Sequence, residues 1–182
     1  MPKLNLKKAS QIAAVIAVSS TAIYQYSRTD YKHWIDADKD CQNTRQEVLI
    51  VESLEEVTLD KKGCEVVKGK WYDSYTDKYF TNPGDLDIDH FVPLGEVDKS
   101  GGHEWSKSKK MEYANDLETE EVLIAVDKSA NRSKGDKDPS NWLPPNKKFQ
   151  CEYIKIWQRV KKQWNLSMDS KEKAFIDAKS KE

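Results

Sequence analysis

The chain has 182 residues, and its 30 basic residues nearly balance its 31 acidic ones, giving a formal net charge of −1. This balance excludes a chain that is basic throughout, so any surface that binds nucleic acid has to be a local one. The length suits one domain with a substantial core, for which six Trp and eight Tyr supply apolar material.

The first 22 residues have the composition of a signal peptide. Three lysines within residues 3–8 precede AAVIAVSSTAIY, an uncharged run too short and too rich in Ser and Thr for a spanning helix. We predict cleavage after Ala22 and export, either to the periplasm or out of the cell. An uncleaved membrane anchor and an amphipathic helix are the alternatives.

The cysteine count agrees with export. Cys41, Cys64 and Cys151 allow one disulfide and leave one thiol, without specifying which two residues pair. No pair among them has the spacing of a zinc finger, so a structural zinc site is not expected.

The elements predicted for the first half of the chain are a helix followed by strands. Thr44 and Glu47 have the spacing of a capping box, which predicts a helix that runs through Leu54. Residues 57–80 combine β-branched and aromatic residues with two glycine breaks, which predicts short strands. LDIDHFVPL, residues 86–94, then predicts a strand that stops at its proline.

The second half of the chain adds helices around one more strand. Together the two halves predict an α+β fold with short flanking strands and packed helices. The predicted elements are a helix over residues 105–117, a strand over 122–126 (VLIAV), a short helix containing ANRSK that Asp127 or Ser129 caps and Gly135 ends, a helix with Tyr153, Trp157, Val160 and Trp164 at helical spacing, and a last helix capped by Asp169 and Glu172.

The strand LDIDH carries an Asp-His pair, although strand interiors avoid Asp. A second strand and a short helix with Asn131 follow, and this order predicts a metal site. Oxygens of Asp89 and Asn131 suit Mg²⁺, with Mn²⁺ as the alternative. His90 would act as a general base on a water that attacks phosphorus. Because neighbouring strand residues point to opposite faces, Asp89 and His90 can share one site only where the strand ends or twists.

Basic residues around Asn131 predict a local phosphate-binding patch. Lys134 lies three residues further along the helix and thus on the same face, and Arg132 and Lys137 add charge. Asp87 is expected to support the site or face solvent. His33 and His103 are expected to be surface residues.

The blocks DIDHFVPL, SGGHEW, YAND and NRSKGDKDPSNWLPP, in this order, resemble the HNH endonuclease family in its small exported bacterial-type branch. The similarity covers about residues 30–165. It implies one nuclease domain over residues 27–182 with a ββα-metal core over about residues 86–136. It also implies cleavage of DNA, or alternatively RNA, to 5′-phosphate and 3′-hydroxyl ends, with Asp89 and Asn131 as metal ligands and His90 as the base. We expect a monomer without a separate recognition domain, and hence low sequence preference.

One position departs from the family pattern. Many members carry an Asn where this chain has Val122, and that Asn helps to orient the histidine. Here Asn115 or a backbone carbonyl has to orient His90, or activity is weak. The alternative function is therefore a non-catalytic exported module that binds nucleic acid or a surface through a disabled HNH site, stabilised by calcium.

A calcium loop is a second metal hypothesis. Asp36, Asp38, Asp40 and Glu47 occupy positions one, three, five and twelve of an EF-hand loop. Cys41 stands where that loop has Gly, and Glu47 is also assigned to the capping box. Any Ca²⁺ bound here is expected to be structural.

Overall fold

A computed structural model describes residues 24–119 and 121–180. The predicted cleavage site after Ala22 lies outside the described residues. None of the helices in the described part of the chain combines the length and apolar character needed to cross a membrane. The predicted α+β class is confirmed, because the described residues form six α-helices and small antiparallel sheets.

The predicted elements are present in the predicted order with shifted ends, and the structure adds helix α2 and three 3₁₀-helices that the sequence analysis does not predict. In chain order, the elements are 3₁₀-helix η1 (Arg28–Asp30), α1 (Thr44–Val51), β1 (Thr58–Leu59), β2 (Val66–Lys68), β3 (Trp71–Asp73), β4 (Lys78–Phe80), η2 (Pro83–Asp85), β5 (Leu86–His90), α2 (Leu94–Lys99), η3 (Gly102–Glu104), α3 (Lys107–Ala114), β6 (Leu123–Asp127), α4 (Lys128–Lys134), α5 (Gln150–Gln163) and α6 (Ser170–Lys179).

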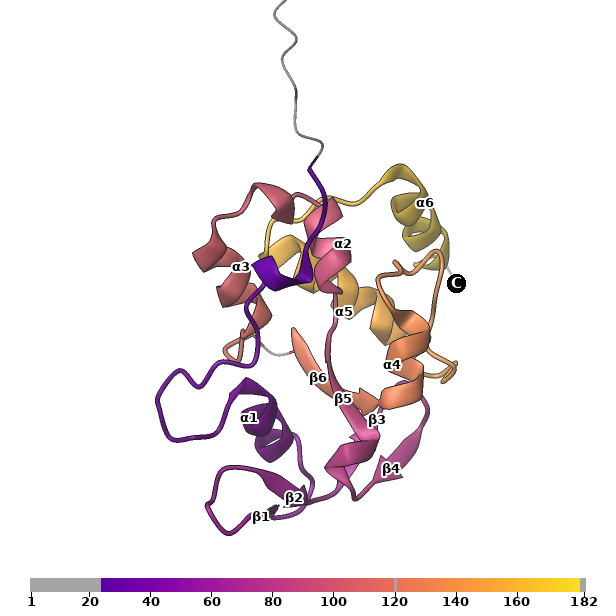
Figure 1. The fold of residues 1–182 in the computed structure, drawn as a ribbon. Coiled ribbons are helices and arrows are strands. Elements are labelled where there is room, and N and C mark those ends of the chain that lie inside the picture. The colour runs from indigo at the N-terminus through magenta and orange to yellow at the C-terminus, as the bar shows by residue number, and fades with distance from the viewer. Residues whose placement is uncertain (1–23, 120, 181–182) are drawn as a thin grey trace, which may run out of the picture.

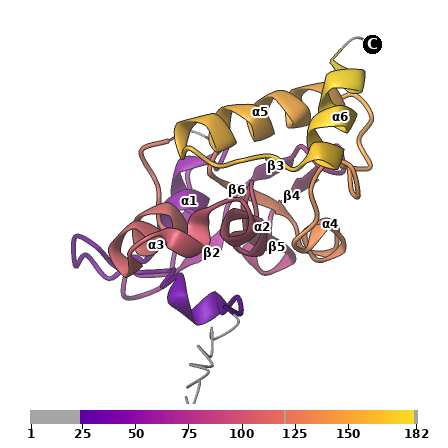
Figure 2. The ribbon, with the colours of Figure 1, turned by 90° about the horizontal axis from the view of Figure 1, so that it is seen from above.

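The antiparallel pair β5/β6 lies at the centre of the molecule (Figure 1). Its register places Leu86 opposite Asp127 and His90 opposite Leu123. The hairpins β1/β2 and β3/β4 lie towards one end, β1/β2 next to α1 and β3/β4 on the other side of β5, and α2, α3 and α6 lie towards the other end (Figure 1). Seen from above, α5 and η1 lie on opposite sides of β5 and β6 (Figure 2).

Helix α5 forms because its apolar residues recur at helical spacing and face an aromatic core. Tyr153, Trp157 and Val160 are all buried, as the spacing predicts. Tyr153 packs on Phe91 at 4.8 Å and on Tyr75 at 5.8 Å between ring centroids. The aromatic core therefore joins α5 to the chain directly after β5.

Three predicted caps can be compared with the structure. The box formed by Asp169 and Glu172 at α6 is confirmed, and Asp127 rather than Ser129 caps α4, accepting from the amide of Ala130 at 2.7 Å. The predicted cap of α1 is wrong. The side chain of Asn43 accepts hydrogen bonds from the free backbone amides of the first turn. The Thr44 hydroxyl instead donates to the carbonyl oxygen of Ile35 at 3.0 Å. The helix also ends at Val51, before Leu54.

One disulfide joins Cys41 to Cys64, and Cys151 is an exposed free thiol. The prediction of one disulfide and one thiol is confirmed, and the structure supplies the pairing. The bond ties the acidic loop before α1 to the hairpin β1/β2. A cross-link between residues 23 positions apart stabilises the fold mainly by restricting the unfolded chain.

Candidate active site

Strand β5 ends at His90, and this ending brings two neighbouring side chains into one site. Asp89 and His90 both line a cavity of about 200 Å³, and Asn131 of α4 lines it from the other side. Pro93 follows as the N-cap of α2, so the chain leaves the sheet directly after the histidine. The ending required for Asp89 and His90 to share a site is therefore present.

Asp89 is 5% exposed, and the hydrogen bonds of its side chain within the described residues are all accepted by Oδ2. The Tyr75 hydroxyl donates to this atom at 2.7 Å, and the Lys134 ammonium forms a short ion pair with it. Burial raises the pKa of Asp89, and the charge of Lys134 opposes that rise. The second oxygen, Oδ1, is the atom left for a ligand in the cavity.

Lys134 is fully buried, which contradicts its predicted role as a contact for substrate phosphate. Besides the ion pair with Asp89, its ammonium donates to the carbonyl oxygens of His90 at 3.1 Å and Phe91 at 2.8 Å. Helical spacing correctly places it on the face of Asn131, but that face packs on β5 instead of facing solvent. Lys134 therefore fixes the end of the strand and neutralises the carboxylate.

His90 is held in one tautomer by a backbone carbonyl. Its Nε2 lies 3.0 Å from the oxygen of Ala114, which can only accept, so Nε2 carries the hydrogen. Burial lowers the pKa of His90 to about 3, so the ring is neutral at pH 7 and Nδ1 keeps its lone pair. Trp34 and Tyr113 stack against the ring, with centroids at 5.6 and 6.0 Å.

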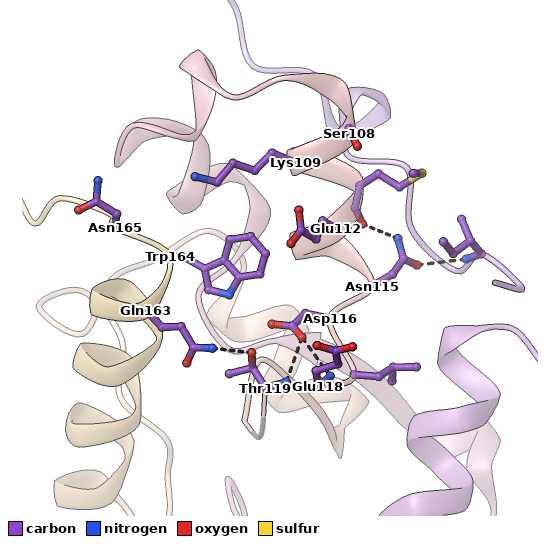
Figure 3. Close-up of a pocket in the computed structure, with 13 residues that line it drawn as sticks. Ser108, Lys109, Glu112, Asn115, Asp116, Glu118, Thr119, Gln163, Trp164 and Asn165 are labelled. Atoms are coloured by element: carbon purple, nitrogen blue, oxygen red, sulfur yellow. Dashed lines mark hydrogen bonds between the residues drawn. The ribbon is translucent and has the colours of Figure 1, made fainter. Parts of the chain in front are cut away.

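Asn115 does not orient His90, so its predicted catalytic role is wrong. Its side chain accepts from the amide of Ile35 at 3.1 Å and the hydroxyl of Thr44 at 2.9 Å. It donates to the carbonyls of Lys32 and Met111, and Figure 3 shows it engaged between α3 and the N-terminal segment. Asn115 lines a separate cavity of about 820 Å³. Its neighbour Ala114 performs the orienting role.

Val122 is fully buried in the core, and its carbonyl accepts from the amide of Phe91 at 2.9 Å. The position that departs from the family pattern therefore contributes packing and extends the strand pairing. Because Ala114 already orients His90, the absence of an Asn at Val122 does not leave the ring unsupported.

Asn131 is oriented by Asp87, whose Oδ2 accepts from its Nδ2 at 3.2 Å. With the amide nitrogen engaged, the amide oxygen is the group that can bind a cation. A carboxylate oxygen of Asp89 and an amide oxygen of Asn131 are hard ligands in one small cavity, and this donor set fits Mg²⁺ or Mn²⁺. Asp87 thus orients the side chain of Asn131, and the role of Asn131 as a metal ligand stays a prediction.

A family model, the C-terminal domain of GmrSD restriction endonucleases, matches residues 25–176. The chain belongs to this family. A secreted protein of Arthroderma benhamiae, itself described as uncharacterized, is 39% identical over 151 residues, which are 83% of this chain and 72% of the relative. No solved structure matches the chain.

The GmrSD-type domain carries two further cations from the predicted patch. Arg132 lines the cavity, and its side chain is 69% exposed with Nε 3.8 Å from Asp87. Lys137 is exposed and donates to the carbonyl of Ser133 at 2.6 Å, outside the residues that line the cavity. Arg132 is thus in place to meet a phosphate in the cavity, whereas Lys137 can act only on the surface nearby.

Sequence reasoning missed four residues that lie in this cavity or pack against His90. Arg28 lines the cavity, and its charge acts on the His90 ring. Asp136 lines it too, and packs on Gly95, where a Cβ would come within 2.6 Å of the carboxyl carbon. His33, expected at the surface, is half-buried with its ring 6.3 Å from that of His90, and Trp34 stacks on the same ring. The positions of Arg28, His33 and Trp34 depend on long-range packing, which leaves no motif in the sequence.

The acidic loop before α1 brings its carboxylates together. Oxygens of Asp36, Asp38 and Asp40 all lie within 4.8 Å of one another. Burial raises the pKa of Glu47, and the negative charges of these three aspartates add to that rise. Cys41, at the position where an EF-hand loop has Gly, adopts a positive φ of 74°. Three of the four predicted calcium residues are therefore neighbours in space, Glu47 is not part of this cluster, and calcium binding itself stays a prediction.

Proposed function

We propose that the protein is a metal-dependent endonuclease that hydrolyses phosphodiester bonds of DNA, as an exported monomer with one nuclease domain and low sequence preference. The observation that carries the proposal is the convergence of Asp89, His90 and Asn131 on one cavity. Membership of a restriction endonuclease domain family supports it.

In this proposal His90 is the general base. Its neutral ring, fixed by the Ala114 carbonyl, presents the Nδ1 lone pair to a water molecule and removes a proton as the water oxygen attacks phosphorus. Trp34 and Tyr113 prevent the ring from rotating away. The products would be a 5′-phosphate and a 3′-hydroxyl.

Asp89 and Asn131 would hold the cation, which stabilises negative charge on the phosphate and the leaving oxygen. Lys134 favours the ionised form of Asp89 and holds its carboxylate through Oδ2, which would leave Oδ1 for the cation. Asp87 keeps the amide of Asn131 turned with its oxygen available. Each ligand thus has a neighbour that sets its orientation.

The test is plasmid nicking by protein lacking residues 1–22, in Mg²⁺, Mn²⁺ or EDTA, with the variant Asn131→Ala. We expect nicking in either metal, none in EDTA, and a loss of at least about 100-fold in Asn131→Ala. Cleavage that survives EDTA would contradict the metal-dependent mechanism. A parallel RNA substrate distinguishes the two nucleic acids.

The non-catalytic alternative loses its main support. It was based on Val122 and a base that lacks an orienting group, but the Ala114 carbonyl orients His90. Retained DNA binding without nicking in any metal would restore this alternative.

A further inference from the structure

The segment that precedes the acidic loop, residues 24–34, reaches the cavity from the side opposite α4. Figure 1 shows η1 and α4 on either side of the stretch that joins β5 to α2. Arg28, in η1, and Arg132, in α4, both line the cavity that contains Asp89, His90 and Asn131. Two arginines from different parts of the chain therefore border the same small space.

Buried contacts fix the segment on both sides of Arg28. The hydroxyls of Tyr24 and Tyr31 donate to the same oxygen of Asp98, at 2.8 and 3.0 Å. Asp98 is 3% exposed and also receives the Lys110 ammonium at 3.4 Å. Because Tyr31 is fully buried, the backbone close to Arg28 is held against α2 and α3.

The last two residues of the same segment pack against His90, the proposed base. Trp34 adopts a positive φ of 57°, an unusual conformation for a large side chain, and stacks on the His90 ring. The carbonyl of Tyr31 contacts Nδ1 of His33, whose ring lies edge-on to that of His90. Arg28 is thus part of a segment that packs on the site at two points.

The chemistry of Arg28 suits a phosphate. A guanidinium carries a permanent charge and donates two parallel hydrogen bonds to a pair of phosphate oxygens. In the cavity the Asp89 carboxylate is already paired with Lys134, so the Arg28 charge is not needed to neutralise it. Arg28 is also exposed, and substrate can therefore reach it.

We propose that Arg28 binds the substrate phosphate in this cavity, from the side opposite Arg132, and stabilises the negative charge that develops as the phosphodiester is attacked. This inference rests on the proposed nuclease function and extends it. It makes Arg28 part of the active site, and the contacts of its neighbours hold it there.

The experiment compares Arg28→Gln and Arg28→Lys with Lys32→Gln. Lys32 is an exposed cation of the same segment that lines a different surface, so its variant removes the same charge away from the site. Because Arg28 and Lys32 are both exposed, unfolding temperatures should match that of the wild type. Each protein is assayed for cleavage of a 16-base-pair duplex in Mg²⁺, and for binding to the labelled duplex in EDTA as salt is varied.

We expect Arg28→Gln to lower kcat about 100-fold, Arg28→Lys about 10-fold, and Lys32→Gln less than about twofold. In EDTA, Arg28→Gln should weaken binding about fivefold and reduce the salt slope by about one, while Lys32→Gln leaves the slope unchanged. If the wild type binds the duplex through Arg28 but does not cleave it, the role of Arg28 in phosphate binding is supported and the proposed nuclease activity is contradicted. Equal binding by Arg28→Gln and Lys32→Gln, or no binding by the wild type at low salt, would overturn the inference.

Discussion

Lys134 and Lys161 are both fully buried and both neutralise carboxylates, but their surroundings differ. Lys161 donates to Glu96, Glu172, Ser100 and the carbonyl of Ser167 at 2.7–3.0 Å. Both oxygens of Glu172 are used there, one by the Trp157 indole and the other by the amide of Asp169. The cluster joins α2, α5 and α6.

The cluster around Lys134 differs in one respect. Among the described hydrogen bonds, those to Asp89 use Oδ2, and the carboxylate lines a cavity beside His90 and Asn131. Burial and ion pairing therefore do not distinguish a structural cluster from a candidate site. The distinction lies in a carboxylate that lines a cavity together with a neutral histidine and an asparagine, the residues proposed as base and second ligand.

The largest expected effect comes from removing either lysine. Lys134→Met and Lys161→Met should each lower the free energy of unfolding by about 3–5 kcal/mol, because each leaves buried carboxylates unpaired. Urea unfolding measures both losses. Only Lys134→Met should also abolish cleavage by the folded protein, since Asp89 loses its orientation. A Lys134→Met variant as stable as the wild type would contradict the role assigned to that ion pair.

Glu52 is a half-buried carboxylate that a backbone amide, instead of an ammonium group, compensates. It accepts from the amide of Ala125 at 2.8 Å, and burial raises its pKa from 4.5 to about 7. A carboxyl group whose pKa is raised by folding contributes fully to stability below pH 4.5. This contribution is lost as the pH rises through about 7. We expect ionisation of Glu52 to lower the free energy of unfolding by about 3 kcal/mol between pH 4.5 and 8.

The variant Glu52→Gln isolates that effect, because other carboxyl groups titrate in both proteins. The stability difference between wild type and Glu52→Gln, measured by urea unfolding, should change with pH in the stated direction. A stability difference that stays constant from pH 4.5 to 8 would show that folding does not raise the pKa of Glu52.

The smallest expected effect concerns the acidic loop. If Asp36, Asp38 and Asp40 bind Ca²⁺ as the sequence pattern predicts, 1 mM Ca²⁺ should raise stability by about 1 kcal/mol for a dissociation constant near 0.1 mM. Calorimetric titration and thermal unfolding measure binding and stabilisation. Asp38→Asn should remove both, with Asp77→Asn as a control carboxylate outside the loop. No heat of binding in the wild type would refute the calcium prediction.

The parts of the site that were predictable are local in sequence. The strand pair β5/β6 and helix α4 follow from alternation, a proline stop and the Asp127 cap, and these place Asp89, His90 and Asn131. The wrong cap at α1 has a local cause too, because Asn43 competes with its neighbour for the same free amides.

The parts that could not be predicted depend on distant contacts. A backbone carbonyl is one of the two groups expected to orient His90, but nothing in the sequence shows that Ala114 supplies it. Arg28 reaches the cavity because Tyr24 and Tyr31 bond to Asp98 far along the chain. The burial of Lys134 depends on which helix face packs on β5, and spacing alone does not decide this.

The most direct test of the central claim compares His90→Ala with His103→Ala in single-turnover cleavage of a DNA duplex in Mg²⁺. His103 is a partly exposed histidine bonded to the carbonyl of Asp98, outside the cavity. We predict a rate loss of about 100- to 10,000-fold for His90→Ala and less than about twofold for His103→Ala. Equal rates for His90→Ala and the wild type would contradict the assignment of His90 as the base.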